Sequence, residues 1–209
     1  MNITSDHWIE GVKRDHLPGG AHMGIRRFLV IHHTDGWGGQ TSIDGWKAKG
    51  NGVCAHIVID RDGTVIQCRP FDRTCGHAGP SAWRDPNTGK LYPGSINGCS
   101  IGIELANCGT LVRETYPITC GPTFYNQPIK RLSARHKNGG PISQWEIYPM
   151  AQLEACKVVS QSIVDRYKLD DLIGHEDCAP NRKNDPGPAL NLQALRESCG
   201  FTKPLGKLD

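Results

Sequence analysis

The stretch R-F-L-V-I-H-H at residues 27–33 is apolar on both of the faces that alternate along a β-strand. Strands of this kind are buried on both sides, so the stretch predicts a central strand with other elements packed above and below it. The stretch S-I-G-I-E-L at Ser100–Leu105 predicts a second interior strand on the same grounds. These two strands indicate the centre of a sheet, and the rest of the chain must supply the layers that cover it.

A helix is predicted over Met150–Tyr167, because apolar residues recur there at the spacing of one helical face. They are Met150, Leu153, Cys156, Val159, Ile163 and Tyr167. Leu192, Leu195 and Cys199 indicate a second, shorter helix. Helices and strands mixed around one sheet are typical of an α/β (α+β) domain with a central mixed β-sheet flanked by helices.

A hairpin is predicted where Val53–Ile59 and Thr64–Cys68 flank the turn sequence Asp60-Arg61-Asp62-Gly63. Between the first strand and this hairpin, a glycine-rich loop at Asp35–Gly39 precedes a short helix that we expect to begin with Ser42 as N-cap. The glycine- and proline-rich segment 76–98 is expected to be a loop.

The length of 209 residues fits one domain. We expect a main domain over 27–200, an N-terminal extension over 1–26 and a C-terminal tail over 201–209. Residues 109–147 show little periodicity, which indicates a long insertion of the kind that often shapes a binding site.

The charge balance gives little reason to expect a nucleic-acid partner, since Lys and Arg exceed Asp and Glu by only 24 − 21 = 3. No apolar run approaches the roughly 18 residues that a transmembrane helix needs, so we expect no membrane partner. The first residues lack a basic segment followed by an apolar one, so we expect no signal peptide and synthesis in the cytoplasm.

The nine cysteines are odd in number and include no C-x-x-C pair. This pattern favours mostly free thiols in a reducing compartment, while a secreted, disulfide-linked chain stays open as the alternative.

The richest chemical pattern is G-H-E-D-C-A-P-N-R-K-N-D-P-G-P at residues 174–188. Three prolines and two glycines make regular structure unfavourable, so we expect a loop with a defined path. His175 and Asp185 carry good zinc-ligand groups ten positions apart, within reach of each other in one loop. A catalytic zinc usually takes a third protein ligand, and His32 or His33 at the end of the apolar strand is the natural candidate.

Five blocks of the sequence resemble, in order, those of a family of zinc amidases. The blocks are V-I-H-H-T at 30–34, A-H-I-V-I-D-R-D-G-T-V at 55–65, G-H-A-G-P-S-A-W at 76–83, N-G-C-S-I-G-I-E-L at 97–105, and the loop at 174–188. The family includes phage lysozyme-type amidases, bacterial amidases of peptidoglycan recycling and animal peptidoglycan recognition proteins. The resemblance covers about 27–195 and is closest to the recycling branch. It implies a hydrolase that cleaves the amide between the lactyl group of N-acetylmuramic acid and L-alanine.

The resemblance implies one zinc ion per chain at one face of the sheet, with His32, His175 and Asp185 as ligands. Because neighbouring strand residues face opposite ways, His33 is left for packing or hydrogen bonding. Glu104 matches a glutamate beside the metal-bound water, and Lys183 matches a lysine that faces the scissile carbonyl.

The resemblance further implies that His77 and Trp83 line the substrate cleft. Some phage members carry a catalytic tyrosine just before the histidine of the hairpin strand, where this chain has Ala55 and His56. We therefore assign proton transfer to Glu104 and expect His56 to be structural. Cys178 matches an apolar position and is expected to be buried and inert.

Two other functional classes stay open: a peptidoglycan-binding module without catalysis, and a cysteine-based enzyme. A binding module would not need the complete set of matched residues, and no cysteine stands in a recognisable nucleophile context. The expected partner is peptidoglycan or a muropeptide and the expected state is a monomer. The setting is either a phage endolysin, which reaches the cell wall after release, or a cytoplasmic recycling enzyme.

Overall fold

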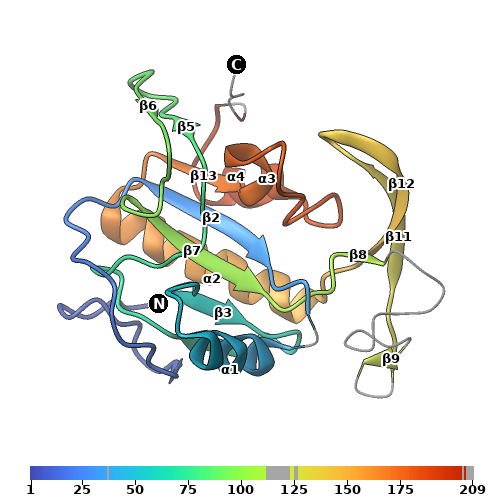
Figure 1. The fold of residues 1–209 in the computed structure, drawn as a ribbon, viewed down its shortest axis with the longest axis horizontal. Coiled ribbons are helices and arrows are strands. Elements are labelled where there is room, and N and C mark those ends of the chain that lie inside the picture. Colours follow the sequence, from blue (N-terminus) through green and yellow to red (C-terminus); the bar gives the residue numbers. More distant parts are fainter. Residues whose placement is uncertain (37, 112–122, 125–126, 204, 206–209) are drawn as a thin grey trace.

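A six-stranded mixed sheet forms the centre of the computed structural model, which describes residues 1–36, 38–111, 123–124, 127–203 and 205 (Figure 1). In spatial order the strands are β1 (Lys13–Arg14), β4 (Val65–Gln67), β3 (Ile57–Ile59), β7 (Ser100–Leu105), β2 (Phe28–His33) and β13 (Asp171–Gly174). Neighbouring strands are parallel except in the β3–β4 hairpin. All six residues of β2 are buried, which confirms the predicted central strand, and β7 has the predicted bounds.

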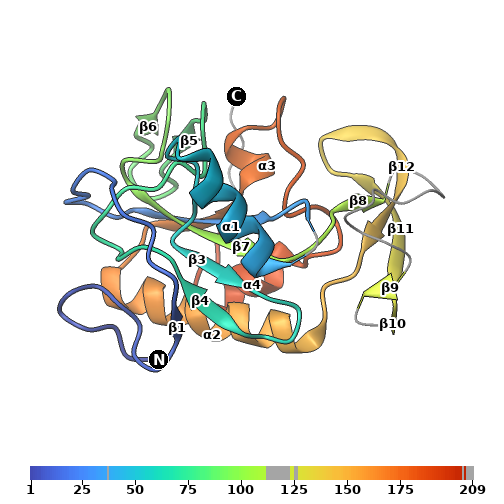
Figure 2. The ribbon, with the colours of Figure 1, turned by 60° about the horizontal axis from the view of Figure 1, so that its bottom comes forward.

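Helices cover both faces of the sheet (Figure 2). On one face, α2 (Met150–Tyr167) and α4 (Leu192–Ser198) pack against alternate strand residues such as Leu29 and Ile103. On the other face, α1 (Gly39–Lys49) packs on β3 through Ile43 and Val58. The α/β architecture with a flanked mixed sheet is therefore the one predicted. None of the helices described is both long and apolar enough to cross a bilayer.

The start of α1 differs from the prediction. The helix begins at Gly39 with Gly38 as N-cap, and the Ser42 hydroxyl donates to the Gly38 carbonyl from inside the first turn. A β-carbon at Gly39 would lie 2.8 Å from a methyl group of Val58, so the absent side chain lets the helix begin against the sheet. That contact is tertiary, and capping preferences along the chain do not reveal it.

The insertion at 109–147 contains more regular structure than expected. β11 (Arg131–His136) and β12 (Gly139–Glu146) form an antiparallel hairpin, and β8 (Thr110–Leu111) pairs with β12. β9 (Thr123–Phe124) pairs with β10 (Gln127–Pro128) in a separate two-stranded piece, and residues 112–122 and 125–126 of the insertion fall outside the described residues.

Two other segments also differ from the expected loops. Within 76–98, β5 (Trp83–Arg84) pairs with β6 (Leu91–Tyr92), and 174–188 opens with the single turn α3 (His175–Cys178).

The N-terminal residues are part of the packed structure. β1 pairs with β4, and the side chains of Ile9, Leu17 and Met23 are buried. Seven cysteines are free thiols, as expected for most of the nine, whereas Cys108 is disulfide-bonded.

Candidate metal centre

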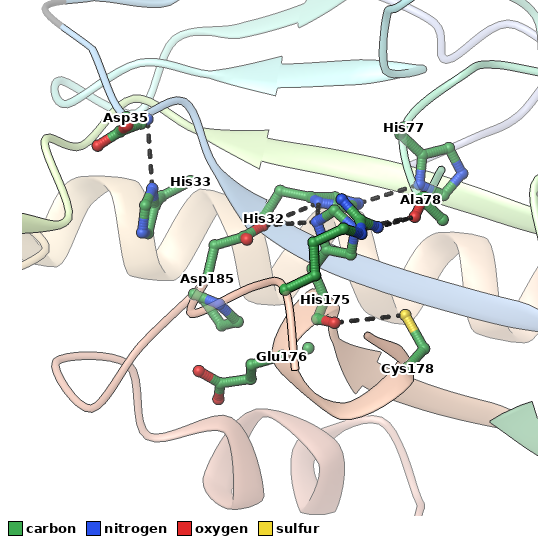
Figure 3. A network of polar contacts seen from close by, with 12 residues as sticks. His32, His33, Asp35, His77, Ala78, His175, Glu176, Cys178 and Asp185 are labelled. Carbon is green, nitrogen blue, oxygen red and sulfur yellow. Dashed lines mark hydrogen bonds and ion pairs between the residues drawn. The ribbon is translucent and has the colours of Figure 1, made fainter. Parts of the chain in front are cut away.

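Three side chains converge at the carboxyl ends of β2 and β13 (Figure 3). The Nδ1 atoms of His32 and His175 are 2.9 Å apart, and each lies 3.0 Å from Oδ2 of Asp185. All three side chains are buried. The two imidazoles and the carboxylate predicted as metal ligands are therefore brought together.

Strand pairing and the path of one loop place these groups. β13 runs parallel to β2 with Gly174 opposite Ile31, so His175 follows its strand at the same edge where β2 ends. The loop then returns, and the backbone N–H of Glu176 donates to the Asp185 carbonyl at 2.8 Å. A β-carbon at Gly174 would lie 2.7 Å from the ring of Pro186, so glycine permits this close return.

The protonation of the three groups suits a divalent cation. Burial lowers the pKa of His32 to about 4, although the contact with Asp185 acts in the opposite direction. Burial alone would raise the pKa of Asp185, but the adjacent imidazoles of His175 and His32 hold it well below its usual range. The Nε2 atom of His175 donates to the Ala78 carbonyl at 3.0 Å, and an imidazole that donates through Nε2 in its neutral form has a lone pair on Nδ1. Nitrogen lone pairs and a carboxylate oxygen facing one point fit a metal such as zinc.

His33 lies apart from this centre (Figure 3). Its Nδ1 accepts a hydrogen bond from the backbone N–H of Asp35 at 3.2 Å. Its ring packs on Gly109, where a β-carbon would lie 2.5 Å away. The strand alternation therefore separated the two histidines as expected, with His33 in a packing and hydrogen-bonding role.

Glu104 lies beside the centre on the same face of the sheet. It is in register with His32 across the β2–β7 pair, and parallel neighbours in register share a face. Its Oε2 atom is buried and has no hydrogen-bond partner among the described residues. Burial, and then the charge of Asp185, raise the pKa of Glu104 well above its usual range, while Lys183 opposes the shift. A carboxyl group in this setting can hold a proton at a pH where an exposed one cannot.

Lys183 stands two residues before Asp185 and is partly buried. Its charge acts on both Glu104 and His32, which places the ammonium near the centre. A cavity of about 520 Å³ opens beside it, between the β11–β12 hairpin and the loop 174–188 that carries His175 and Asp185, here called the ligand loop. Among its lining residues are Pro141, Trp145, Asn181, Lys183 and Asn184.

His77 and Trp83 lie behind the centre. His77 is buried, with its Nδ1 atom 3.0 Å from Nε2 of His32. Trp83 is 1% exposed, and its indole N–H donates to Asp171 at 3.1 Å. Contact of either residue with a substrate stays a prediction, and both side chains have contacts within the protein.

His56 and Cys178 lie in the interior, as expected. The Nε2–H of His56 donates to the Arg73 carbonyl at 2.8 Å, and its Nδ1 accepts from the Gly102 N–H at 3.0 Å. Burial raises the pKa of the Cys178 thiol to about 12, which keeps it protonated.

Sequence reasoning missed a clamp on the ligand loop. At the turn of the β11–β12 hairpin, His136 Nε2 lies 2.6 Å from Glu176, and Lys137 pairs with Glu176 at 2.7 Å and Asp177 at 2.6 Å. The side-chain amide of Asn138 donates to the Glu176 carbonyl at 2.9 Å. The Asn-Gly dipeptide at this turn is a hairpin signal that could have located it.

Comparison with known proteins points to the family that the sequence blocks resemble. The model of the N-acetylmuramoyl-L-alanine amidase family matches residues 23–188. The chain is 30% identical over 146 residues to the 1,6-anhydro-N-acetylmuramyl-L-alanine amidase AmpD of Escherichia coli K12. This match covers 69% of the chain and 57% of AmpD, so the chain spans little more than half the length of this curated relative.

Two solved structures share the fold. The crystal structure of a selenomethionine derivative of AmpD has a TM-score of 0.63 at 22% identity, covering 95% of this chain and 99% of the other. Escherichia coli AmiD, in complex with the substrate anhydro-N-acetylmuramic acid-L-Ala-D-gamma-Glu-L-Lys, has a TM-score of 0.59 at 24% identity, covering 87% and 60%.

Proposed function

The chain belongs to the N-acetylmuramoyl-L-alanine amidase family, and from this premise we propose that it hydrolyses the amide between the lactyl group of N-acetylmuramic acid and L-alanine. The observation that carries the proposal is the meeting of His32, His175 and Asp185 within 3.0 Å of one another. A module that only bound peptidoglycan would not need this buried set, nor a carboxyl of raised pKa next to it.

We propose that the three residues hold one zinc ion per chain. When bound, zinc lowers the pKa of a coordinated water towards ~7 and polarises a substrate carbonyl. Two imidazoles and one carboxylate match the donor types and number typical of catalytic zinc sites.

We assign proton transfer to Glu104. A carboxyl whose pKa is raised by burial can accept a proton from the attacking water and later deliver it to the leaving nitrogen of L-alanine. Its buried Oε2 atom, which no described residue hydrogen-bonds, supports this role, because a carboxylate with a purely structural task would be hydrogen-bonded.

We assign stabilisation of the negative charge on the carbonyl oxygen to Lys183. A cation placed where charge develops acts strongly in a site shielded from water, with a contribution on the order of 3 kcal/mol. Its position at the rim of the cavity supports a contact with the substrate on the open side.

We propose 1,6-anhydro-muropeptides as the substrate class. The support is the name of the AmpD relative and the ligand in the AmiD structure, which both contain the anhydro sugar linked to L-alanine. The cavity beside Lys183 could hold the stem peptide, and the hairpin of the insertion would form its outer wall.

The proposal is tested with purified protein loaded with zinc. We expect about one zinc per chain by elemental analysis and release of the free stem peptide from an anhydro-muropeptide, followed by mass spectrometry. An Asp185→Asn variant should lose both the metal and the activity. Intact sacculi assayed in parallel separate a recycling enzyme from a wall-degrading endolysin. Stoichiometric binding of the muropeptide without cleavage, in zinc-loaded protein, would overturn the proposal in favour of a binding module.

A further inference from the structure

The dipeptide His77-Ala78 contacts the Nε2 atoms of both histidines proposed as metal ligands. The carbonyl of Ala78 accepts from His175 Nε2, and the ring of His77 meets His32 Nε2 at 3.0 Å. The rings of His32 and His77 meet edge to face, with centroids 5.1 Å apart (Figure 3). A backbone carbonyl can only accept, so His175 Nε2 is the donor in its contact with Ala78, which at 3.0 Å is shorter than its 3.3 Å contact with the Arg182 guanidinium. An imidazole partner, in contrast, can donate or accept. Which of the two imidazoles donates in the His32–His77 contact must therefore be decided by their other hydrogen bonds.

The contacts of His77 Nε2, on the far side of the ring from His32, decide which imidazole donates. His77 Nε2 lies 3.2 Å from the hydroxyl oxygen of Ser100 and 3.4 Å from its carbonyl oxygen. The Ser100 hydroxyl donates its own hydrogen to the Ile96 carbonyl at 2.7 Å. Since that hydrogen is in use, both oxygens of Ser100 face His77 as acceptors, and the proton of a neutral His77 belongs on Nε2. Its Nδ1 atom is then an acceptor, aimed at His32.

The packing around His77 keeps the ring in this orientation. The ring lies over Gly102 of β7, where a β-carbon would be 2.6 Å from the imidazole. The next residue is anchored because the Ala78 N–H donates to the side chain of Asn97 at 2.8 Å. A glycine in the middle of an interior strand thus has a steric reason, which is to admit a histidine ring above it.

We propose that His77 is a positioning residue for the metal centre: it accepts the Nε2 proton of His32 and so presents the Nδ1 lone pair of His32 to the metal. The inference rests on the proposed metal centre and extends it from the ligands to the groups behind them. Groups that orient a ligand histidine in this way change metal affinity by about 10- to 100-fold when they are removed.

The first test measures zinc affinity by competition with a chromophoric chelator, so that catalysis is not needed. His77→Phe keeps the bulk of the ring but accepts no proton, and we expect its zinc affinity to fall about 10- to 100-fold. His77→Gln can accept from His32 through its oxygen and donate to Ser100 through its nitrogen. We expect it to recover most of the loss.

His56→Phe is the matched control. His56 is equally buried on the same face, 5.8 Å from the His77 ring, but it hydrogen-bonds the backbone of Arg73 and Gly102 and neither of the ligand histidines. Its substitution should leave zinc affinity within about threefold, below the range expected for a group that orients a ligand. Equal zinc affinities for the wild type, His77→Phe and His77→Gln would overturn the proposal.

The second test needs no variant and therefore does not depend on whether a variant folds. Two-bond ¹H–¹⁵N correlation spectra of the zinc-loaded wild type report which ring nitrogen of His77 carries the proton. We expect the Nε2–H form, and a His77 proton on Nδ1 would refute the proposal. Both tests stand apart from substrate hydrolysis, so a protein that binds zinc through His32 but cleaves no muropeptide would refute only the proposed activity.

Discussion

Replacing Glu104 with glutamine should act in opposite directions on catalysis and on stability. Glutamine keeps the shape of the side chain but carries no charge and no transferable proton. Glu104 combines a buried Oε2 atom that lacks a partner among the described residues with a pKa raised by burial and by Asp185. We therefore expect Glu104→Gln to be a poor enzyme and, in zinc-free form above acidic pH, a more stable protein.

The size of the stability effect follows from proton binding. Above about pH 4.5 the unfolded chain ionises Glu104 freely, while the folded chain retains the proton because its pKa is raised. At this site the folded state then binds more protons, so the contribution of Glu104 to the stability of the wild type falls as pH rises, by about 1.4 kcal/mol per pH unit. This loss continues until the pH reaches the folded pKa. Glu104→Gln lacks this contribution, so its advantage over the wild type should grow by the same amount per pH unit.

The assay is urea unfolding of both proteins with a chelator present, between about pH 5 and pH 7. On zinc-loaded protein, kcat for an anhydro-muropeptide should fall about 10²- to 10⁴-fold, as expected when a general acid–base group is removed. Glu154→Gln, on the exposed side of α2, is the control and should change neither quantity. A stability difference that does not vary with pH would refute the reasoning about burial. A kcat within tenfold of wild type would refute the catalytic assignment.

Four other predictions follow from the same structure. Lys183→Ala should lower kcat about 10²- to 10³-fold with zinc content unchanged, and a normal rate would exclude its assigned role. Chelation should lower the thermal midpoint by removing about 4 kcal/mol when zinc exceeds its Kd about 1,000-fold, and calorimetry with and without zinc measures this. Glu146→Ala removes the carboxylate that binds buried Arg61 through two contacts of 2.8 Å, and should cost about 3–5 kcal/mol in urea unfolding. Burial lowers the pKa of His56 to about 4, so the unfolded state binds more protons between about pH 6.5 and 4. The contribution of His56 to stability should therefore fall by about 1.4 kcal/mol per pH unit on acidification, and the stability of the wild type relative to His56→Phe should fall by that amount.

The elements predicted correctly are those whose pattern of apolar residues reflects which of their faces are buried. β2 and β7 are apolar on both faces because both faces are covered, and the buried side of α2 repeats at helical spacing. The hairpin β11–β12 escaped prediction because most of its residues are exposed on both faces, so no hydrophobic alternation marks the strands. The dipeptide Asn138-Gly139 at the turn is the local sequence signal that indicates this hairpin.

The residues of the site also fall into those that the sequence predicted and those that it could not. The loop composition pointed to His175 and Asp185, and alternation along β2 indicated that only one of His32 and His33 could join them, but the choice of His32 came from the family resemblance. The position of His77 could not be predicted from its neighbours in sequence, because it depends on Ser100 in another strand and on closure of a loop over Gly102. Such contacts exist only after the sheet has formed.

The separation of His32 and His175, 143 positions apart, has a consequence for how the protein acquires its metal. Of the three proposed ligands, a growing polypeptide on the ribosome offers only His32 until His175 has emerged, and the full set only after residue 185 has emerged and β13 has aligned with β2. Closing a segment of that length costs about 4 kcal/mol in chain entropy, and backbone pairing between the two strands meets that cost without any ion. The apoprotein should therefore keep its fold, unlike a zinc finger, and exchange one metal for another without unfolding.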